Sequence, residues 1–282
     1  MNHSIIPGAH WPAVMGVLNV TPDSFSDGGH FSDREAALQQ ARTMVEAGAD
    51  CLDIGGESTR PGADPVPVQE EIDRVCPVLE AIRSELDIPV SLDTSTPEVM
   101  REGARLGATL INDVRALRRE GAVEAARDSG LPVCIMHMQG EPATMQQQPE
   151  YADDVVSDVL AFLRNRTREL VEAGIGRECL MLDPGFGFGK TLEHNLTLLD
   201  RLESITAEGL PVLVGMSRKS MLGKVTGRDV AGRMPASVAA ATVAMMKGAA
   251  VVRAHDVPET VDAARLVRAL GQMHGNREYD YG

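Results

Sequence analysis

The sequence predicts a single parallel (β/α)8 barrel, and three observations lead to this fold class. The chain has 282 residues, a length at which barrels routinely form one domain. Eight short apolar runs alternate with longer segments whose apolar residues recur at helical spacing. These runs are almost continuously apolar, which is typical of parallel strands covered on both faces. An open doubly wound sheet is the alternative, but it usually has fewer strands and a glycine fingerprint after the first one, which this sequence lacks.

The eight strands are predicted from runs of aliphatic residues that end in polar or glycine-rich segments. In chain order they cover residues 13–20, 51–55, 89–93, 109–114, 132–137, 179–183, 212–216 and 250–253. Each is followed by a helical pattern, so the repeated unit is strand, loop and helix.

The helices are predicted from apolar stripes and from their start signals. Ser32 with Glu35 forms a capping box for the first helix, and Pro77 is expected to kink the second. Thr96 and Pro97 stand where an N-cap and an N1 proline belong. Further helices are expected at about 121–129, 152–173, 192–207, after Ser220 and at 258–270. Linker-like stretches are absent, so residues 1–282 are predicted to form one domain with a short N-terminal lead at 1–12.

Composition excludes several classes of protein. A formal net charge of −14 argues against nucleic acid or an anionic membrane as a partner, because both require a basic face. The longest apolar run, 236–252, is alanine-rich and contains Lys247, so it is not a membrane span. The N-terminus lacks the pattern of a signal peptide.

The four cysteines indicate a reducing compartment. Cys51, Cys76, Cys134 and Cys179 are scattered without the CxxC spacing of metal or redox sites. Three of them fall in predicted buried strands, where cysteine acts as a small apolar residue. A cytoplasmic protein is therefore expected.

The carboxyl ends of all eight predicted strands carry polar residues. A barrel of this type places its active site at these ends. An Asp or Asn at a strand end is more often a helix cap than a ligand, but eight polar ends of eight are harder to explain in that way. The residues are Asn19, Asp53, Asp93, Thr94, Ser95, Asn112, Asp113, His137, Asp183, Ser217, Arg218, Lys219, Ser220, Arg253 and His255.

The segment 179–190, CLMLDPGFGFGK, resembles a phosphate-binding loop at first sight. In a Walker A loop the first glycine would stand at Pro184, which has a fixed φ and no N–H to donate. The segment instead offers Asp183 at a strand end, followed by a loop with two flat aromatic rings. This arrangement suits a flat polar ligand better than a phosphate.

The polar strand ends divide into two chemical sets. The first offers acceptors and amide donors suited to a heterocycle such as a pterin or guanine. It comprises Asp93, Asn112 and Asp183, with Lys219 as a cation and with Met136 and Phe188 as apolar walls. For Lys219 the alternative is a structural ion pair, and for Met136 it is simple core packing.

The second set is cationic and suits a phosphorylated ligand. It comprises Thr59, Arg60, Arg253 and His255, although Arg60 could also be a solvated loop charge. Asn19 is a neutral oxygen ligand of the kind that Mg²⁺ accepts when phosphate oxygens and waters complete its shell.

Eight motifs together resemble the bacterial dihydropteroate synthases. They are NVTPDSFSDGG at 19–29, DIGGESTRPG at 53–62, SLDTS at 91–95, INDV at 111–114, HMQG at 137–140, LDPGFGFGK at 182–190, GMSRKS at 215–220 and RAHDV at 253–257. Any single motif can occur by chance, but the ordered set is highly specific.

The resemblance implies a (β/α)8 enzyme that joins 6-hydroxymethyl-7,8-dihydropterin diphosphate to 4-aminobenzoate and releases pyrophosphate. It implies pterin contacts from Asp93, Asn112, Met136, Asp183, Phe188, Lys219 and Arg253, diphosphate contacts from Asn19, Thr59, Arg253 and His255, and an aminobenzoate pocket from Phe25, Thr59, Arg60, Pro61 and Ser220.

The same resemblance implies Mg²⁺ bound at Asn19 and displacement without a nucleophilic side chain. Charge would be stabilised by Asp93, Lys219, Arg253 and His255. A homodimer is expected, with the helix around 237–247 as a candidate interface, and the family is a sulfonamide target. Two alternatives are a non-catalytic pterin-binding paralogue and a methyltetrahydrofolate–corrinoid methyltransferase.

Overall fold

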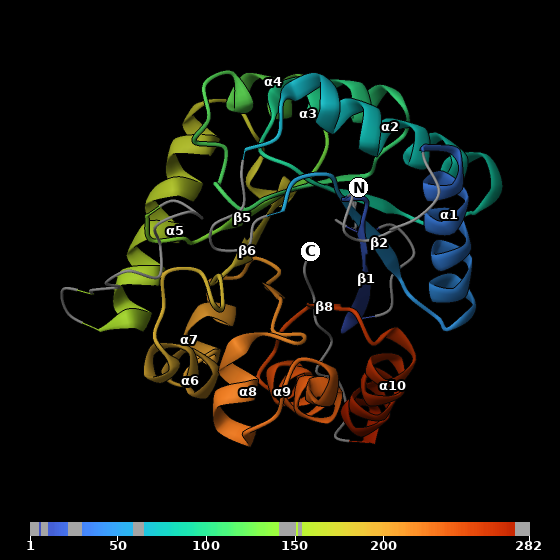
Figure 1. The fold of residues 1–282 in the computed structure, drawn as a ribbon. Coiled ribbons are helices and arrows are strands. Elements are labelled where there is room, and N and C mark those ends of the chain that lie inside the picture. Colours follow the sequence, from blue (N-terminus) through green and yellow to red (C-terminus); the bar gives the residue numbers. More distant parts are fainter. Residues whose placement is uncertain are drawn as a thin grey trace.

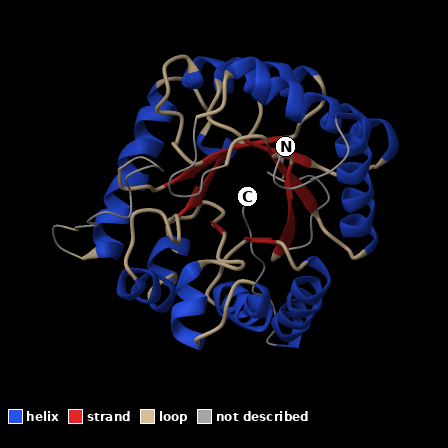
Figure 2. Cartoon of the chain, in the orientation of Figure 1, coloured by secondary structure: helices blue, strands red, loops and turns tan. Residues whose placement is uncertain are grey.

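The computed structural model describes residues 6, 11–21, 30–58, 65–140, 151 and 154–273. Eight parallel strands form one sheet in the order β6-β5-β4-β3-β2-β1-β8-β7. A parallel bridge between Leu182 and Val212 joins the two ends of this sheet. Figure 2 shows the strands at the centre and the helices around them. The predicted barrel is confirmed.

The strands agree with the predicted runs to within one residue at each end, except for the seventh. They are β1 Ala13–Asn19, β2 Cys51–Gly55, β3 Val90–Asp93, β4 Leu110–Asp113, β5 Val133–Met136, β6 Leu180–Asp183, β7 Leu213–Val214 and β8 Val251–Ala254. The seventh was expected to reach Met216, but Met216 instead accepts a hydrogen bond from the Lys219 N–H in a turn. The chain therefore leaves the sheet early.

The helices follow one another around the barrel in sequence order (Figure 1). They are α1 His30–Glu46, α2 Val68–Glu85, α3 Pro97–Arg105, α4 Ala122–Ser129, α5 Val155–Glu172, α6 Leu192–Asp200, α7 Glu203–Thr206, α8 Ser220–Thr226, α9 Met234–Met246 and α10 Val257–Met273. None of the described helices combines the length and the apolar character needed to cross a membrane.

One helix start and one cap hydrogen bond differ from the sequence prediction. α1 begins at His30, before Ser32, so the predicted capping box does not mark its start. Thr96 and Pro97 occupy the N-cap and N1 positions of α3 as predicted, but the Thr96 side chain makes no cap hydrogen bond. Its hydroxyl donates to the carboxylate of Glu71 at 2.5 Å instead. A long-range partner thus replaces the local cap.

Two further predictions are corrected by local breaks in the chain. The helix expected over 192–207 is divided into α6 and α7. Cys179 lies in a short 3-10 turn, Arg177–Cys179, and is only half-buried, because β6 begins one residue later. Cys51, Cys76 and Cys134 are buried, and all four cysteines are free thiols.

Two stacked layers of the barrel interior follow from strand alternation. The first, which we call the apolar layer, contains Met15, Cys51, Leu110, Cys134, Met181, Leu213 and Val251, and Ile6 and Trp11 pack against it. Residues two apart on a strand face the same side. The next inward positions are therefore Val17, Asp53, Asn112, Met136, Asp183, Gly215 and Arg253. Polar chemistry thus begins one step above an apolar base.

Candidate active site

Arg253 on β8 is the centre of the polar part of the barrel interior. Its Nε donates to Asp53 Oδ2 at 2.6 Å, and its second terminal nitrogen donates to Asp93 Oδ2 at 2.8 Å. The Asn112 amide donates to the same Asp53 oxygen at 3.1 Å. We call Asp53, Asp93, Asn112 and Arg253 the central cluster. The structure thus brings together three of the predicted pterin residues from three different strands.

Asp53 is the residue of this cluster to which the sequence assigned no role. Its side chain is fully buried, and its Oδ1 has no hydrogen-bond partner within the described part of the chain. A buried carboxylate oxygen without a donor costs on the order of 1–3 kcal/mol or more. The sequence signal was available, because Asp53 stands two residues after buried Cys51 on the same strand face. A ligand N–H would satisfy this oxygen.

The buried acids of the site have altered protonation. Burial raises the pKa of Asp93 to about 7 against the opposing charge of Arg253, and the negative charges of Asp53 and Asp113 add to the rise. Burial also raises the pKa of Asp183, although the Lys219 charge acts against it. Burial lowers the pKa of Arg253, but the nearby carboxylates, chiefly Asp53 and Asp93, together raise it by more. The pKa therefore lies above its usual value, and the guanidinium stays charged.

Lys219 lies in the turn after β7, immediately before α8. Its ammonium donates to the Phe186 carbonyl oxygen and lies 4.5 Å from the centroid of the Phe188 ring. Burial lowers the pKa of Lys219 to about 8. Among the described residues no carboxylate lies within ion-pair distance of it, so the alternative of a structural ion pair is not supported. The Lys219 ammonium, near Asp183, therefore has N–H donors left for a ligand.

Met136 and Phe188, which were predicted to be apolar walls of the site, lie in one apolar cluster. They pack together with Val114 and Met138 in a small cluster that is separate from the main core. Met136 is opposite Asp183 in the β5–β6 register. The apolar wall therefore adjoins the polar edge, which is the arrangement that a flat heterocycle requires.

The predicted phosphate-side residues are only partly described. His255 follows β8, and its backbone N–H and ring Nδ1 are both 3.1 Å from the Ser217 hydroxyl oxygen. Asn19 is half-buried at the end of β1, and Ser220 is exposed at the start of α8. Neither side chain hydrogen-bonds to the described central cluster. Phe25, Thr59, Arg60 and Pro61 lie outside the described residues.

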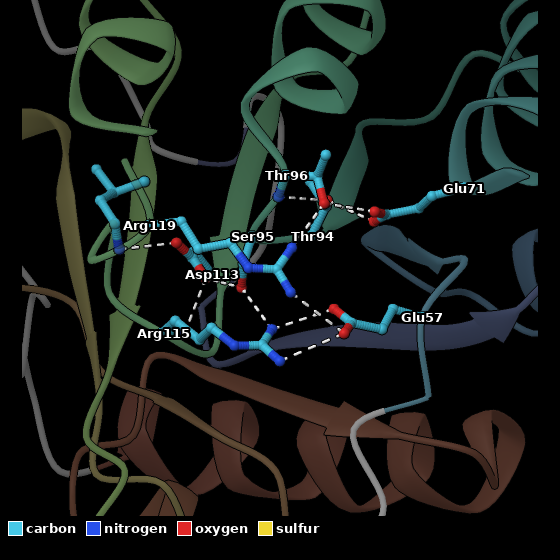
Figure 3. Close-up of polar contacts among 9 residues, drawn as sticks. Glu57, Glu71, Thr94, Ser95, Thr96, Asp113, Arg115 and Arg119 are labelled. Carbon is cyan, nitrogen blue, oxygen red and sulfur yellow. Dashed lines mark hydrogen bonds and ion pairs between the residues drawn. The ribbon is translucent and has the colours of Figure 1, made fainter. Parts of the chain in front are cut away.

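A second polar cluster lies at the ends of β2, β3 and β4 (Figure 3). We call it the rim cluster, and it comprises Glu57, Glu71, Thr94, Ser95, Thr96, Asp113, Arg115 and Arg119. Arg115 contacts Glu57 at 3.1 Å and the Ser95 hydroxyl at 3.1 Å. Arg119 contacts the Thr96 hydroxyl at 2.8 Å. Thr94, Ser95 and Asp113, noted as polar strand ends, therefore belong to a structural network.

The comparisons with known proteins decide the family. Residues 15–255 match the family model of pterin binding enzymes. The chain is 52% identical over 269 residues to the dihydropteroate synthase of Escherichia coli K12, with 95% of each chain covered. It belongs to the dihydropteroate synthase family. Because members of this family are transferases, the chain is an enzyme of that class.

Solved structures of the family have the same fold. A crystal structure of the Yersinia pestis dihydropteroate synthase in complex with a sulfonamide drug superposes with a TM-score of 0.88 at 52% identity, covering 93% of this chain and 95% of that chain. The Xanthomonas albilineans dihydropteroate synthase with 4-aminobenzoic acid gives 0.87 at 48% identity, with 92% and 93% covered.

Proposed function

We propose that this member of the dihydropteroate synthase family joins 6-hydroxymethyl-7,8-dihydropterin diphosphate to 4-aminobenzoate, forming 7,8-dihydropteroate and pyrophosphate. The observation that carries the proposal is the layer of Asp53, Asn112, Asp183 and Arg253 above an apolar base. Its unmatched acceptor at Asp53 and its buried acid at Asp183 suit a heterocycle with N–H donors. The identity to named synthases over nearly the whole chain supports the same substrate.

The pterin ring would lie between the Met136–Phe188 wall and the Arg253 side chain. Asp183 and Asn112 would bind its amide and amino edge, and Lys219 would donate to its carbonyl oxygen. Asp93, held by Arg253, would face the part of the ring nearest the reacting methylene. Each residue occupies a position on a strand or tight turn, so little reorganisation is needed on binding.

The reaction breaks the bond between the pterin methylene carbon and the diphosphate oxygen, and forms a bond from the same carbon to the aminobenzoate nitrogen. Arg253 and His255 would take up the growing charge of the leaving pyrophosphate, and such contacts are worth roughly 2–4 kcal/mol each in the transition state. Positive charge left on the methylene would be delocalised over the conjugated ring and stabilised by the carboxylate of Asp93. The arylamine is neutral and needs no base before attack, and its proton leaves to solvent after the new bond forms.

The donor set fits a magnesium ion held mainly by substrate. No group of three or more His, Cys, Asp or Glu side chains in the described part of the chain is arranged to hold a metal by itself. Asn19 offers one neutral oxygen at the barrel mouth, which suits an ion whose other ligands are phosphate oxygens and water. When bound, Mg²⁺ would neutralise charge on the diphosphate. Asn19 would orient that end of the substrate.

The aminobenzoate pocket is proposed for Phe25, Thr59, Arg60, Pro61 and Ser220. Ser220, at the start of α8, is next to Lys219 and so adjoins the pterin site. Support comes from the Xanthomonas albilineans relative, whose crystal structure contains 4-aminobenzoic acid.

We also propose a cytoplasmic homodimer. The four free thiols suit a reducing compartment. On α9, Val243 and Met246 are 42% and 52% exposed, while Ala240 and Ala244 face the core, so an apolar face is left for a second copy. Sedimentation equilibrium tests this, and a monomer at micromolar concentration would refute it.

The function is tested by incubating both substrates with the protein and measuring dihydropteroate by chromatography, with and without Mg²⁺. We expect product with Mg²⁺ and much less after chelation. Absence of product with pterin still bound would indicate the non-catalytic paralogue. Methyl transfer from methyltetrahydrofolate to a corrinoid would indicate the other alternative.

A further inference from the structure

Lys190 is a buried charged side chain that the proposed reaction does not use. Its side chain is 3% exposed. Its Nζ lies 2.9 Å from the Gly185 carbonyl oxygen, 3.0 Å from that of Phe188 and 2.9 Å from His137 Nδ1. An ammonium has three N–H donors, and these three acceptors use all of them. Lys190 therefore binds backbone and a histidine, and no donor remains for a ligand.

The residues that Lys190 holds belong to one loop. Residues 184–190, which we call the glycine-rich loop, run against the backbone at the end of β5. A Cβ added at Gly185 would lie 1.9 Å from the His137 carbonyl oxygen, and one at Gly189 would lie 2.6 Å from that of Gln139. Both glycines have positive φ. The close approach of the loop to the backbone after β5 thus requires glycine at both positions. Lys190 stabilises this approach by its hydrogen bond to His137.

The same loop shapes the pterin site. The Gly185 N–H donates to Asp183 Oδ1 at 2.7 Å, and the Phe186 carbonyl accepts from Lys219. The Phe188 ring lies beneath the Lys219 ammonium. Three proposed pterin contacts, Asp183, Phe188 and Lys219, therefore depend on the path of this loop. Lys219 would donate to the pterin, whereas Lys190 binds the backbone of the glycine-rich loop.

Two contacts from outside the glycine-rich loop also hold it, and they bind other backbone groups than Lys190 does. The Gly187 N–H donates to Asn195 Oδ1 at 2.7 Å, and the Tyr151 hydroxyl donates to the Gly189 carbonyl at 2.7 Å. These contacts fix the outer backbone of the loop. The carbonyls of Gly185 and Phe188, on either side of Phe186 and Gly187, are bound by Lys190.

We propose that Lys190 is a positioning residue for the pterin site, which sets the positions of Asp183 and Phe188 by binding the backbone of the glycine-rich loop and His137. This inference rests on the proposed pterin-binding function. A buried cation is costly unless its hydrogen bonds are complete, so the contact is expected to be rigid and sensitive to the charge on Lys190.

Protonation gives this role a distinctive pH dependence. Burial lowers the pKa of Lys190 to about 7, while Asp183 acts to raise it and Lys219 to lower it. Burial and the Lys190 charge lower the pKa of His137 to about 2, so its ring stays neutral and its Nδ1 accepts. Arg118 adds a further positive charge near His137. As pH rises through 7, Lys190 loses one N–H donor and the loop loses one of its three ties.

The test measures the binding of 6-hydroxymethylpterin, which carries no diphosphate, from pH 6 to pH 9. Lys190→Met keeps the length of the side chain and removes all donors. We expect about tenfold weaker binding than wild type at pH 6, a typical size for loss of a residue that orients a ligand-binding group. The ratio should shrink toward pH 9, because wild-type Lys190 is then uncharged. Asp93 and Lys219 titrate in both proteins, so their effects largely cancel in the ratio.

Lys224→Met on α8 is the matched control, because Lys224 is exposed, and its binding should equal wild type at every pH. Lys190→Gln, which keeps a neutral donor, should bind with intermediate affinity and replaces Lys190→Met if that variant does not fold. A folded variant with wild-type pterin affinity, or a deficit constant with pH, would overturn the positioning role. Failure of the wild-type protein itself to bind the pterin would instead refute the proposed function.

Discussion

The rim cluster and the central cluster occupy the ends of the same strands but differ in how completely the protein satisfies them. Asp113 in the rim cluster accepts hydrogen bonds from the Ser95 hydroxyl and from the N–H groups of Arg115 and Leu117. Asp53 in the central cluster has one buried oxygen with no partner within the described residues. A carboxylate completed by its own chain indicates a structural role, whereas an incomplete one indicates a place for a ligand.

The two clusters also interleave along the chain. Asp93 and Ser95 are two residues apart, yet Asp93 binds Arg253 and Ser95 binds Asp113. Asn112 and Asp113 are adjacent and face opposite ways, because successive strand residues alternate. Polarity at a strand end is therefore insufficient to assign a catalytic role. The side of the strand on which the residue lies decides it.

The largest effect that would sharpen this comparison is expected from Asp113→Ala. The change leaves three donors buried without an acceptor, at a cost of roughly 1–3 kcal/mol each, part of which relaxation recovers. We expect Tm to fall by roughly 10 °C in a thermal melt. Pterin affinity of the folded protein at low temperature should stay within about twofold of wild type, since Asp113 hydrogen-bonds to no residue of the central cluster.

Asp128→Ala is the control for this variant, because the Asp128 side chain is 63% exposed and its pair with Arg127 lies at the surface. It should leave Tm unchanged. Strong loss of pterin affinity in Asp113→Ala with no loss of stability would contradict the division into structural and ligand-binding clusters.

Asp183→Asn is expected to produce the opposite pattern. Asparagine keeps an oxygen that can accept from the Gly185 N–H. It also removes a buried carboxyl group whose pKa burial already raises. Stability should be unchanged or slightly higher. Pterin affinity should fall by about a hundredfold, since the amide nitrogen meets ligand donors with another donor. Titration calorimetry measures the affinity and a thermal melt the stability.

Asp200→Asn, at an exposed position at the end of α6, should change neither quantity. If Asp183→Asn lowered Tm and left pterin binding intact, Asp183 would belong with the structural carboxylates.

The fold was predictable because each strand carries its own signal. Continuous apolar runs and helical stripes are local, and their number fixes the barrel. The cap hydrogen bonds were less accessible, since Thr96 is the N-cap of α3 as predicted but its hydroxyl donates to the distant Glu71. The start predicted at Ser32 was wrong because α1 begins at His30, and a local capping pattern does not exclude an earlier start.

The sequence indicated which residues lie in the candidate site, but not which of them hydrogen-bond to one another. Asp93, Asn112 and Asp183 were identified from their positions at strand ends, and all three lie in the barrel interior. The partners of Arg253 were not, because they lie 200 and 160 residues away along the chain. The role of Lys190 was also hidden. Its sequence context resembles a phosphate-binding loop that fails at Pro184, and only the folded loop shows that its donors go to the carbonyls of Gly185 and Phe188 and to His137.

The smallest effect is expected from Lys190→Ala on the binding of inorganic pyrophosphate. All donors of Lys190 are used by Gly185, Phe188 and His137. The proposed phosphate contacts instead lie on β8, directly after it, and at Asn19 at the end of β1. We expect the pyrophosphate affinity, measured by calorimetry with Mg²⁺, to change by less than about twofold. Arg253→Met, assayed in parallel, should weaken it at least tenfold, because it removes a charged donor. A loss in Lys190→Ala equal to that in Arg253→Met would mean that the glycine-rich loop binds phosphate after all, and that the division between a pterin wall on β6 and a phosphate site on β8 is wrong.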